Sequence, residues 1–418
     1  MRRDIVAGVT TFLTMSYIVV ANPAILSTPG TAIPFSGALT ATVLVCFTMT
    51  LLMGVYAGLP FGVAPGMGLN AFFAYTLIIN GGIPWPGALG IIFWAGVAFL
   101  LVSITPLRER VALAIPQTLR SATAAGIGLL LTFIGLQNAG FVASNPATMV
   151  GVGPLDHRAL LVLAGLVVSV WLGRRDNPFA YLAGIALVTA GAWLGGYVSP
   201  PAAWLSAPDF SSVFLKLDVW GALRLSLVPA LVTVMLTDLF DSLSTFIGVA
   251  QAANLTDDRG EPKNLRQGLI VDSFATFGAA LFGSSSGTAY VESIAGIRMG
   301  GRTGASAIVT ALCFLPCLFI APVAAAIPTY ATSPVLILVG VSMFQAVTRV
   351  TFERPEIAVP AFATLILIPL TFSITQGILW GFILHAALHA VSGRAREVTA
   401  AAWGLAAVSI ALLIIERG

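Results

Sequence analysis

Apolar runs long enough to cross a membrane follow one another along almost the whole chain of 418 residues. A helix needs roughly 20 apolar residues to span the hydrocarbon core of a bilayer, which is about 30 Å thick. The runs are continuously apolar instead of alternating with a period of two, so they predict helices and not the strands of a membrane barrel. Fourteen spans are predicted, at 5–26, 36–57, 60–80, 85–105, 120–140, 158–173, 179–199, 225–250, 267–283, 284–299, 303–326, 333–348, 356–372 and 375–392. A further apolar segment at 399–415 either crosses the membrane or lies against the others.

The composition agrees with this pattern and excludes a soluble globule. Hydrophobic residues make up 58% of the chain and charged residues 9%, whereas typical soluble domains carry about 25% charged residues. The net charge of +3 is small and lies in the loops, so it bears on orientation in a membrane and gives no sign of a nucleic-acid partner. We predict an all-α polytopic membrane protein in a lipid bilayer.

The Lys and Arg residues collect in alternate loops. Most of them occur in "RER" (108–110), "RRD" (174–176), "DDRGEPKNLR" (257–266), "RMGGR" (298–302), "TRVTFERPE" (348–356) and "SGRAR" (392–396). By the positive-inside rule these loops face the cytoplasm. The prediction is a multi-pass protein of the plasma membrane (the inner membrane in a bacterium) with a cytoplasmic N-terminus.

The chain contains a faint internal repeat. The stretch 114–139 aligns with 326–347, and seven predicted spans separate the two copies. Seven is an odd number, so the second half is expected to be inverted with respect to the first, as in many transporters. The third and tenth spans, around 60–76 and 282–301, are interrupted by Gly, Ser and Pro. Irregular backbone at membrane depth is tolerated where it is buried or lines a cavity. Close helix packing also explains glycines, but the matched pair favours a binding site at mid-membrane.

Few ionisable residues fall clearly within the predicted spans and not at their boundaries: Asp238, Asp241, Asp272, Glu292, His385 and His389. Carboxylates at this depth cost roughly 2.5–3.5 kcal/mol or more and usually mark the path of an ion or substrate. Asp238 and Asp241 are three residues apart, so on a helix they project to neighbouring directions. With Glu292 close by, at least one of the three should hold a proton near neutral pH. A proton-coupled carrier needs such a group.

The remaining polar residues differ in what they predict. Asp272 lies near the start of its predicted span, where capping the helix or pairing with a loop is as well supported as a role on an ion or substrate path. The two histidines lie near the cytoplasmic end and are expected at the membrane interface. Glu292 has Thr288, Tyr290 and Ser293 around it in the broken tenth span. Asn70 in the third span offers an amide donor and a carbonyl acceptor, which suits the edge of a heterocycle better than an inorganic ion.

Other chemistry finds no support in the sequence. The three cysteines, Cys46, Cys313 and Cys317, lie in apolar runs without a further Cys or His partner, so we assign them to packing. No phosphate-binding loop, hydrolase or metal motif occurs, and neither a metal nor a cofactor is expected. An intramembrane aspartyl enzyme would carry its two acids on separate helices, whereas Asp238 and Asp241 share one. Uphill transport would therefore draw on an ion gradient and not on an enzymatic reaction.

Four motifs together resemble the azaguanine-type (AzgA-like) purine permeases, which belong to the nucleobase–cation symporter and nucleobase–ascorbate transporter fold. The motifs are "GVTTFLTMSYIVVANPAIL", "APGMGLNAFFAYT", "TDLFDSLSTFIG" and "TAYVESIAGIRMGGRTG", in this order along the chain. The resemblance implies fourteen transmembrane segments as two inverted seven-span repeats, with a short strand and a half-helix in each of spans 3 and 10. It also implies a core domain (1–105 and 223–326) and a gate or scaffold domain (106–222 and 327–418), which commonly mediates a homodimer.

The resemblance also implies the site residues. The purine-contacting positions are Asn70, Asp238 and Glu292, and the neighbouring Gly68 and Asp241 are also needed for transport. Substrates in the family are adenine, guanine and hypoxanthine, which are moved with protons. Two features depart from the family pattern: the eighth-span motif reads "DSLS", with Ser242 and Ser244, and Gly287 stands where a hydroxyl residue is expected.

The physical reading agrees with these assignments. Carboxylates and an amide complement the N–H donors and the N or O acceptors of a purine. Phe72, Phe73 and Tyr290 are candidates for stacking on the base, and Thr288 and Ser293 for contacts to its edge. We expect Asp238 to bind the base, with Asp241, Glu292 and Asp238 as candidates for proton coupling and gating.

Three functions remain in view. The leading hypothesis is a proton-coupled purine importer in which the core slides against a fixed scaffold, an elevator-like form of alternating access. The alternative is an anion or organic-acid carrier on the same inverted-repeat fold, but carboxyl groups at the site oppose an anionic substrate. A channel or receptor would need a continuous polar lining, whereas the polar residues here cluster at one depth.

Overall fold

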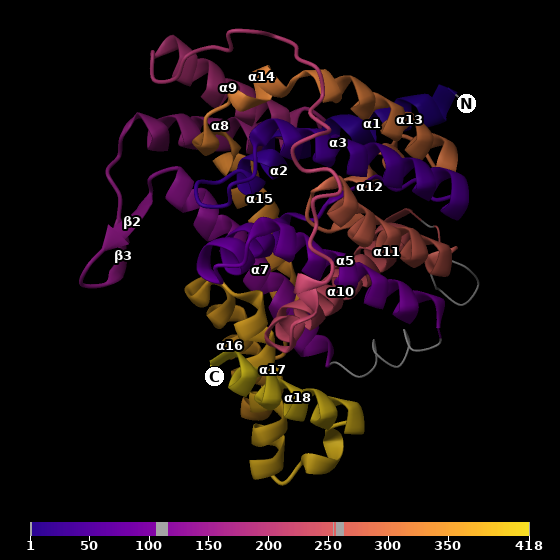
Figure 1. The fold of residues 1–418 in the computed structure, drawn as a ribbon, viewed down its shortest axis with the longest axis vertical. Coiled ribbons are helices and arrows are strands. Elements are labelled where there is room, and N and C mark those ends of the chain that lie inside the picture. The colour runs from indigo at the N-terminus through magenta and orange to yellow at the C-terminus, as the bar shows by residue number, and fades with distance from the viewer. Residues whose placement is uncertain (1, 106–115, 254, 256–262, 418) are drawn as a thin grey trace.

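The computed structural model describes residues 2–105, 116–253, 255 and 263–417, which form a helical bundle (Figure 1). Within this part of the chain, seven helical segments are long and apolar enough to cross a membrane: Arg2–Leu26, Phe35–Ala57, Trp85–Ile104, Gln117–Asn138, Leu225–Ile247, Thr329–Arg349 and Ile374–Val391. Shorter apolar helices occupy most of the other predicted spans: Met67–Asn80, His157–Gly173, Ala180–Leu194, Gly304–Phe319 and Pro355–Thr371. The charged stretches expected at 108–110 and 257–262, and the domain boundary expected after 105, adjoin or fall in residues outside the described ranges.

The elements of the first half, in chain order, are as follows. They are α1 (Arg2–Met15), α2 (Ile18–Leu26), α3 (Phe35–Leu52), η1 (Met53–Ala57), β1 (Val63–Pro65), α4 (Met67–Ala71), η2 (Phe72–Asn80), α5 (Trp85–Ile104), α7 (Gln117–Asn138), β2 (Val142–Asn145), β3 (Met149–Val152), α8 (His157–Gly173) and α9 (Ala180–Leu194). A short helix, α4, follows the strand β1 after Gly66, as the resemblance in the sequence motifs implies for the third span. The hairpin of β2 and β3 projects from the helices in Figure 1.

The second half repeats this order of elements. After η3 (Gly221–Leu223) and η4 (Leu225–Leu227) come α10 (Val228–Ala253), α11 (Leu265–Phe282), β4 (Gly287–Ala289), α12 (Ser293–Arg298), α13 (Gly304–Phe314), η5 (Leu315–Phe319), α14 (Ala321–Ala325), η6 (Thr329–Thr332), α15 (Ser333–Phe344), η7 (Gln345–Arg349), α16 (Pro355–Thr371), α17 (Ile374–Val391), η8 (Ala395–Glu397) and α18 (Ala400–Arg417). The strand β4 and the short helix α12 stand in the tenth span, as β1 and α4 stand in the third.

The packing separates two sets of helices. In one, α1 packs against α12 and α13, and α5 packs against α11; in the other, α7 packs against α15 and α16, and α8 against α9. Figure 1 shows α1, α3 and α13 together at one end and α16, α17 and α18 at the other. Small residues allow the close approaches: a Cβ atom on Gly340 of α15 would lie 2.5 Å from the carbonyl oxygen of Gly128 of α7. Glycine at both positions therefore lets these two helices pack backbone to backbone.

The segment expected at 399–415 forms α18, which packs along α17. Leu412 and Leu413, near the end of α18, pack with Leu379, which lies early in α17, and with Val228 at the start of α10. Contacts between the end of one helix and the beginning of the other mean that α18 runs antiparallel to α17. Helix α18 therefore lies against the bundle, antiparallel to α17, which occupies the last of the fourteen predicted spans.

The long connection before α10 is fastened to α3 by Asp209. The carboxylate of Asp209 accepts hydrogen bonds from the Ser36 hydroxyl at 2.9 Å, from the Ser211 hydroxyl at 3.1 Å and from the Ser212 amide at 3.1 Å. Partial burial alone would raise the pKa of Asp209, but these hydrogen bonds outweigh it and lower the pKa to about 2. The ionised form is thus the one that holds the connection in place.

Candidate functional site

The two interrupted spans meet at a crossing of short strands. Strands β1 and β4 pair antiparallel, with Ala64 opposite Thr288 and Pro65 opposite Gly287. The hydrogen bonds from Gly66 N to Ser286 O, at 3.0 Å, and from Tyr290 N to Gly62 O, at 2.9 Å, extend the pairing on both sides. All six strand residues are buried. Each strand leads toward a short helix, so residues far apart in sequence meet in the interior of the bundle.

Gly287 is explained by this crossing. A Cβ atom at this position would lie 2.9 Å from the Cβ of Ala275 and 3.0 Å from its carbonyl oxygen, both in α11. Any side chain would push β4 away from α11, so the hydroxyl residue expected from the family pattern has no room here.

Two buried aspartates, one on α10 and one on α11, lie beside β4. Asp238 of α10 is 0% exposed and accepts a hydrogen bond from the Thr276 hydroxyl of α11. Asp272 of α11 is also 0% exposed and accepts from the hydroxyls of Ser242 and, at 3.3 Å, Thr288. The expectation that Asp272 lies near the start of its helix is wrong. It lies two turns inside α11, because α11 already begins at Leu265.

These aspartates have capacity left for a ligand. The Oδ1 atoms of both Asp238 and Asp272 are buried and have no hydrogen-bond partner within the described residues. A buried carboxyl oxygen without a partner costs free energy, of order 1–3 kcal/mol or more. Their two carboxyl groups also repel each other when both are ionised. A proton or a hydrogen-bond donor from a substrate would relieve both costs.

Glu292 stands at the start of α12 and is held by a tyrosine of the first span. The Tyr17 hydroxyl donates to Glu292 Oε1 at 2.8 Å, and Tyr17 is 1% exposed. The ring of Tyr17 also packs edge-on against Tyr181 of α9, with 5.0 Å between ring centroids. Glu292 is half-buried. The carboxyl group of Glu292 therefore lies where the helix set of α1 and α12 meets that of α9.

Asn70 of α4 is fully buried, with its side chain facing the loop before β4. The Ser285 hydroxyl donates to Asn70 Oδ1, and the Asn70 amide lies 3.8 Å from the Met67 sulfur. Gly68, in the same short helix, faces α7: a Cβ atom there would lie 2.4 Å from Ile127 Cγ2. Phe73, one turn further on, is 0% exposed within the main hydrophobic core.

Three other predicted site residues form hydrogen bonds at the strand crossing or with Asp272 beside it. Tyr290 is buried, and its hydroxyl donates to the carbonyl of Pro65 in β1. Ser293 accepts from Gly62 N at 3.0 Å and donates to the Tyr290 carbonyl at 2.7 Å. Thr288 belongs to the hydrogen-bond network of Asp272 described above. The structure thus gives these three side chains protein partners, and their contact with a substrate stays a prediction.

Asp241 differs from Asp238 in its surroundings, although the two are three residues apart. Asp238 faces α11 and is fully buried, whereas Asp241 is half-buried and makes no hydrogen bond or ion pair with a described residue. The charge of Glu292 acts on Asp241. The α10 carboxyl groups therefore face different neighbours, one the strand crossing and the other the side of Glu292.

Several residues of this network were not assigned a role from the sequence. Tyr17, Thr276 and Ser285 are 275, 38 and 215 residues from their carboxyl or amide partners. The sequence pointed to two of them in part, because Tyr17 lies in the first of the four motifs and Ser285 lies in the interrupted tenth span. The histidine pair lies in the last two turns of α17, with His389 Nδ1 2.8 Å from the His385 carbonyl oxygen.

Two cavities in the described structure have none of the site's carboxyl groups in their lining. One, of about 650 Å³, opens between α2, η2, α7 and η6, and its lining includes Thr28, Tyr75, Asn138, His157 and Tyr330. The other, of about 10 Å³, lies between α10 and the helices α7, α16 and α17. Among the described residues, no three His, Cys, Asp or Glu side chains are arranged as ligands for a metal ion.

Comparisons with known proteins agree with the sequence motifs. Residues 2–380 match the model of the Permease family. The chain is similar to the adenine permease AdeP of Escherichia coli (strain K12), with 39% identity over 399 residues, or 95% of this chain and 89% of AdeP. It is also similar to the guanine/hypoxanthine permease PbuO of Bacillus subtilis (strain 168), with 37% identity over 406 residues, or 95% of this chain and 93% of PbuO.

Among solved structures, the fold is similar to the transmembrane domain of a cyanobacterium bicarbonate transporter, BicA. The TM-score is 0.66 at 19% identity, and the match covers 91% of this chain and 97% of that domain. At this identity the likeness concerns the fold alone. The predicted all-α fold of two inverted seven-span repeats is confirmed.

Proposed function

This chain belongs to the Permease family, which confirms the resemblance in its sequence motifs, and we propose that it carries purine nucleobases across the membrane together with protons. The observation that carries the proposal is the set of carboxyl groups around the crossing of β1 and β4. Asp238 and Asp272 each keep a buried oxygen without a partner there. The names of its relatives, adenine permease and guanine/hypoxanthine permease, support purines as the substrate class.

In this proposal the base lies between the strand crossing and α7. Asp238, Glu292 and the amide of Asn70 supply acceptors and donors for the ring edge, since a purine presents N–H donors beside N or O acceptors. A protonated carboxyl group both donates and accepts, so it pairs with an adjacent donor and acceptor on the base. Thr288 supplies the hydroxyl group of β4, and Phe73 is a candidate for apolar contact with the base.

Proton coupling follows from the number of carboxyl groups brought together. Like charges in a region of low dielectric oppose simultaneous ionisation. A proton on one carboxyl group removes its repulsion of the next, so the remaining carboxylate accepts from the base, and the proton and the base bind together. Asp241, Glu292 and Asp238 are the candidates for the coupled group. One proton moving through 100 mV supplies about 2.3 kcal/mol, enough for roughly fiftyfold accumulation of a neutral base.

Movement is proposed to be elevator-like. Residues 1–105 and 223–326 form the core that carries the substrate, and residues 106–222 and 327–418 form the gate, which also supplies the contact of a homodimer. The two packed sets of helices in the fold support this division, because α7 packs against α15 and α16 while α5 packs against α11. We place the protein in the plasma membrane, and the distribution of Lys and Arg in the loops supports a cytoplasmic N-terminus.

The experiment that tests the proposal is uptake of radiolabelled adenine, guanine and hypoxanthine into proteoliposomes under an inward proton gradient. We expect saturable uptake of at least one purine, its collapse when the gradient is dissipated, and a loss of more than tenfold in Glu292→Gln and in Asp238→Asn. Glu353→Gln, which alters an exposed carboxylate, should transport normally. No purine uptake, with gradient-driven uptake of an organic anion instead, would overturn the proposal.

A further inference from the structure

The larger of the two cavities lies between helix ends of both packed sets and takes no part in the carboxyl network. Its volume is about 650 Å³, within the range of about 300–1,000 Å³ that is usual for small-molecule sites. In the division proposed above, its walls at α2 and η2 belong to the core, and those at α7, α8 and η6 belong to the gate. A molecule that fills the cavity therefore contacts both parts.

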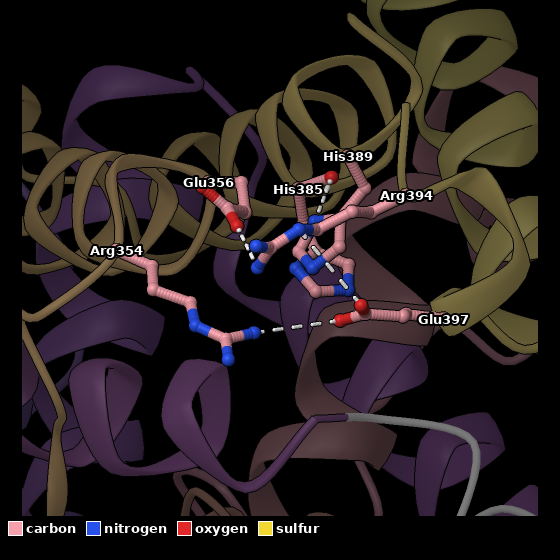
Figure 2. Close-up of polar contacts among 6 residues, drawn as sticks. All are labelled: Arg354, Glu356, His385, His389, Arg394 and Glu397. Carbon is pink, nitrogen blue, oxygen red and sulfur yellow. Dashed lines mark hydrogen bonds and ion pairs between the residues drawn. The ribbon is translucent and has the colours of Figure 1, made fainter. Parts of the chain in front are cut away.

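The cavity lies at the face of the bundle opposite the basic loops. Tyr330, in its wall, stands at the start of the helical segment Thr329–Arg349, whose 21 residues give it a length of about 30 Å. Just beyond the other end of this segment, Glu356 pairs with Arg394 at 2.8 Å (Figure 2). The loops at that end carry the arginines that predict a cytoplasmic location. In this topology the cavity opens to the outside.

Aromatic rings line the cavity from both sets of helices. His157 is the first residue of α8, and its ring stacks on that of Tyr197 with 3.7 Å between the centroids. The ring of Tyr330 meets that of His157 edge-on, with 6.4 Å between the centroids. Phe35 and Tyr75 belong to the wall on the side of α3 and η2. Aromatic rings of this kind suit a flat base, because every base has a π face that stacks.

The polar groups of the wall match the edge of a neutral heterocycle. The Tyr330 side chain is 9% exposed, and its buried hydroxyl has no hydrogen-bond partner within the described residues. Gln137 and Asn138 add amide groups, which donate and accept. No Asp or Glu of the described residues belongs to the wall, and Arg158, which does, lies 3.8 Å from the carboxylate of Asp156. Such a wall favours a neutral ring over an organic anion.

One helix connects this cavity with the carboxyl site. Asn70 and Tyr75 lie in the same apolar helix, Met67–Asn80, with Tyr75 about 7 Å further along the axis. In the predicted topology this helix runs outward, so Tyr75 is nearer the outside than Asn70. A base that enters from outside therefore meets the wall of the cavity before it reaches Asn70.

We propose that this cavity is an outer binding site for the purine base, where the ring stacks among the aromatic side chains and accepts a hydrogen bond from the Tyr330 hydroxyl before it moves to the carboxyl groups. The inference rests on the proposed purine transport. Binding in the cavity uses no carboxyl group, so it does not depend on Asp238. The outer site and the strand crossing can therefore be tested separately.

The test asks whether a purine protects a thiol placed in the wall of the cavity. Ser27→Cys is a conservative change of a half-buried residue of this wall. The native thiols, Cys46, Cys313 and Cys317, lie outside the wall, so the wild-type chain gives the background of labelling. In right-side-out membrane vesicles, a membrane-impermeant maleimide should label Ser27→Cys. At least one of adenine, guanine and hypoxanthine should slow this labelling at least threefold.

Further substitutions in the Ser27→Cys chain assign the protection to the outer site. With Asp238→Asn, the purine concentration that gives half-protection should stay within twofold, because this change affects the strand crossing. Tyr330→Phe should raise that concentration at least fivefold without lowering the melting temperature, since the hydroxyl it removes has no protein partner. Tyr56→Phe, in an exposed tyrosine of η1, should change nothing. His157→Leu should weaken protection, whereas His157→Phe keeps a flat ring and should retain it.

The outcomes separate the outer site from the proposed function. A half-protecting concentration that rises more than tenfold with Asp238→Asn, or one that Tyr330→Phe leaves unchanged, would overturn the outer site. Purine uptake by the wild type without any protection of Ser27→Cys would also overturn it and would leave purine transport intact. Absence of both uptake and protection would remove the proposed function as well.

Discussion

Gly68 provides a sharp test of the packing of α4 against α7. A Cβ atom at this position would lie 2.4 Å from Cγ2 of Ile127 on α7, whereas ordinary carbon–carbon contacts are about 3.5–4.0 Å. The Ile127 methyl group is attached to the branched Cβ of a side chain that is 3% exposed, so it cannot swing away freely. In Gly68→Ala, α4 and α7 must therefore separate by about 1 Å, or one of them must distort.

The expected magnitude follows from the cost of overpacking. An extra methyl group in a well-packed interior costs about 1–3 kcal/mol, which corresponds to a factor of about 5–150 in an equilibrium or rate constant. We expect Gly68→Ala to slow purine counterflow by a factor in that range, because in the proposed elevator-like movement the contact between α4 and α7 has to form and dissolve. Purine counterflow and thermal unfolding of the purified protein, measured side by side, separate slow transport from loss of fold.

Ile127 supplies a matched pair of second-site variants. Ile127→Ala removes Cγ2, so Gly68→Ala/Ile127→Ala should recover most of the loss relative to Ile127→Ala alone. Ile127→Val keeps Cγ2 and should not rescue Gly68→Ala. Wild-type transport in Gly68→Ala, or equal rescue by Ile127→Val and Ile127→Ala, would refute the steric argument.

The other predictions concern the hydrogen bonds and charges of single residues. Tyr17→Phe removes the donor to Glu292, and because a hydrogen bond to a charged group contributes about 1.5–3 kcal/mol, purine affinity should fall by up to about a hundredfold in a binding titration; unchanged affinity would contradict this. Arg394→Met leaves the carboxylate of Glu356, whose side chain is 7% exposed, without its ion-pair partner, so the melting temperature should fall. The loss in free energy of unfolding should be smaller than the about 3–5 kcal/mol measured when a fully buried pair is broken. Adding Glu356→Gln should recover part of the lost melting temperature. Asp209 has its pKa lowered to about 2 in the folded protein, so its contribution to stability is present above about pH 4 and disappears as the pH falls toward 2. The difference in melting temperature between wild type and Asp209→Asn should shrink over that interval, and a constant difference would refute the assignment.

Much of the fold could be predicted because a membrane imposes length and hydropathy on each span. The predicted span 36–57 corresponds to the helical segment Phe35–Ala57, and 375–392 to α17 (Ile374–Val391). The interruption of the tenth span by Gly and Ser similarly indicated the break in the helix where β4 now lies, and the resemblance in the motifs implied the strand itself. These features are local, so they can be read without knowing which helices are neighbours.

The site could be predicted only in part, because hydrogen-bond partners depend on packing between distant segments. Asp238 and Glu292 stand out in the sequence as charges in apolar runs, and the structure buries or half-buries both. Asp272 was assigned to a helix start, although it lies beside Thr288 within the same network. The donor to Glu292 is Tyr17, which comes from the first span and carries no charge pattern to reveal it. The orientation of Tyr290 toward the Pro65 carbonyl likewise depends on the register of two strands.

Equilibrium binding of adenine, guanine, hypoxanthine and uracil to the purified protein tests the central claim most directly. Wild type should be measured beside Glu292→Gln and Asp238→Asn, with Glu353→Gln as the exposed control. We predict that at least one purine binds, that uracil binds more weakly, and that each substitution at the strand crossing lowers the affinity more than tenfold while the control does not. Binding of no purine, or purine binding that survives both Glu292→Gln and Asp238→Asn, would contradict it.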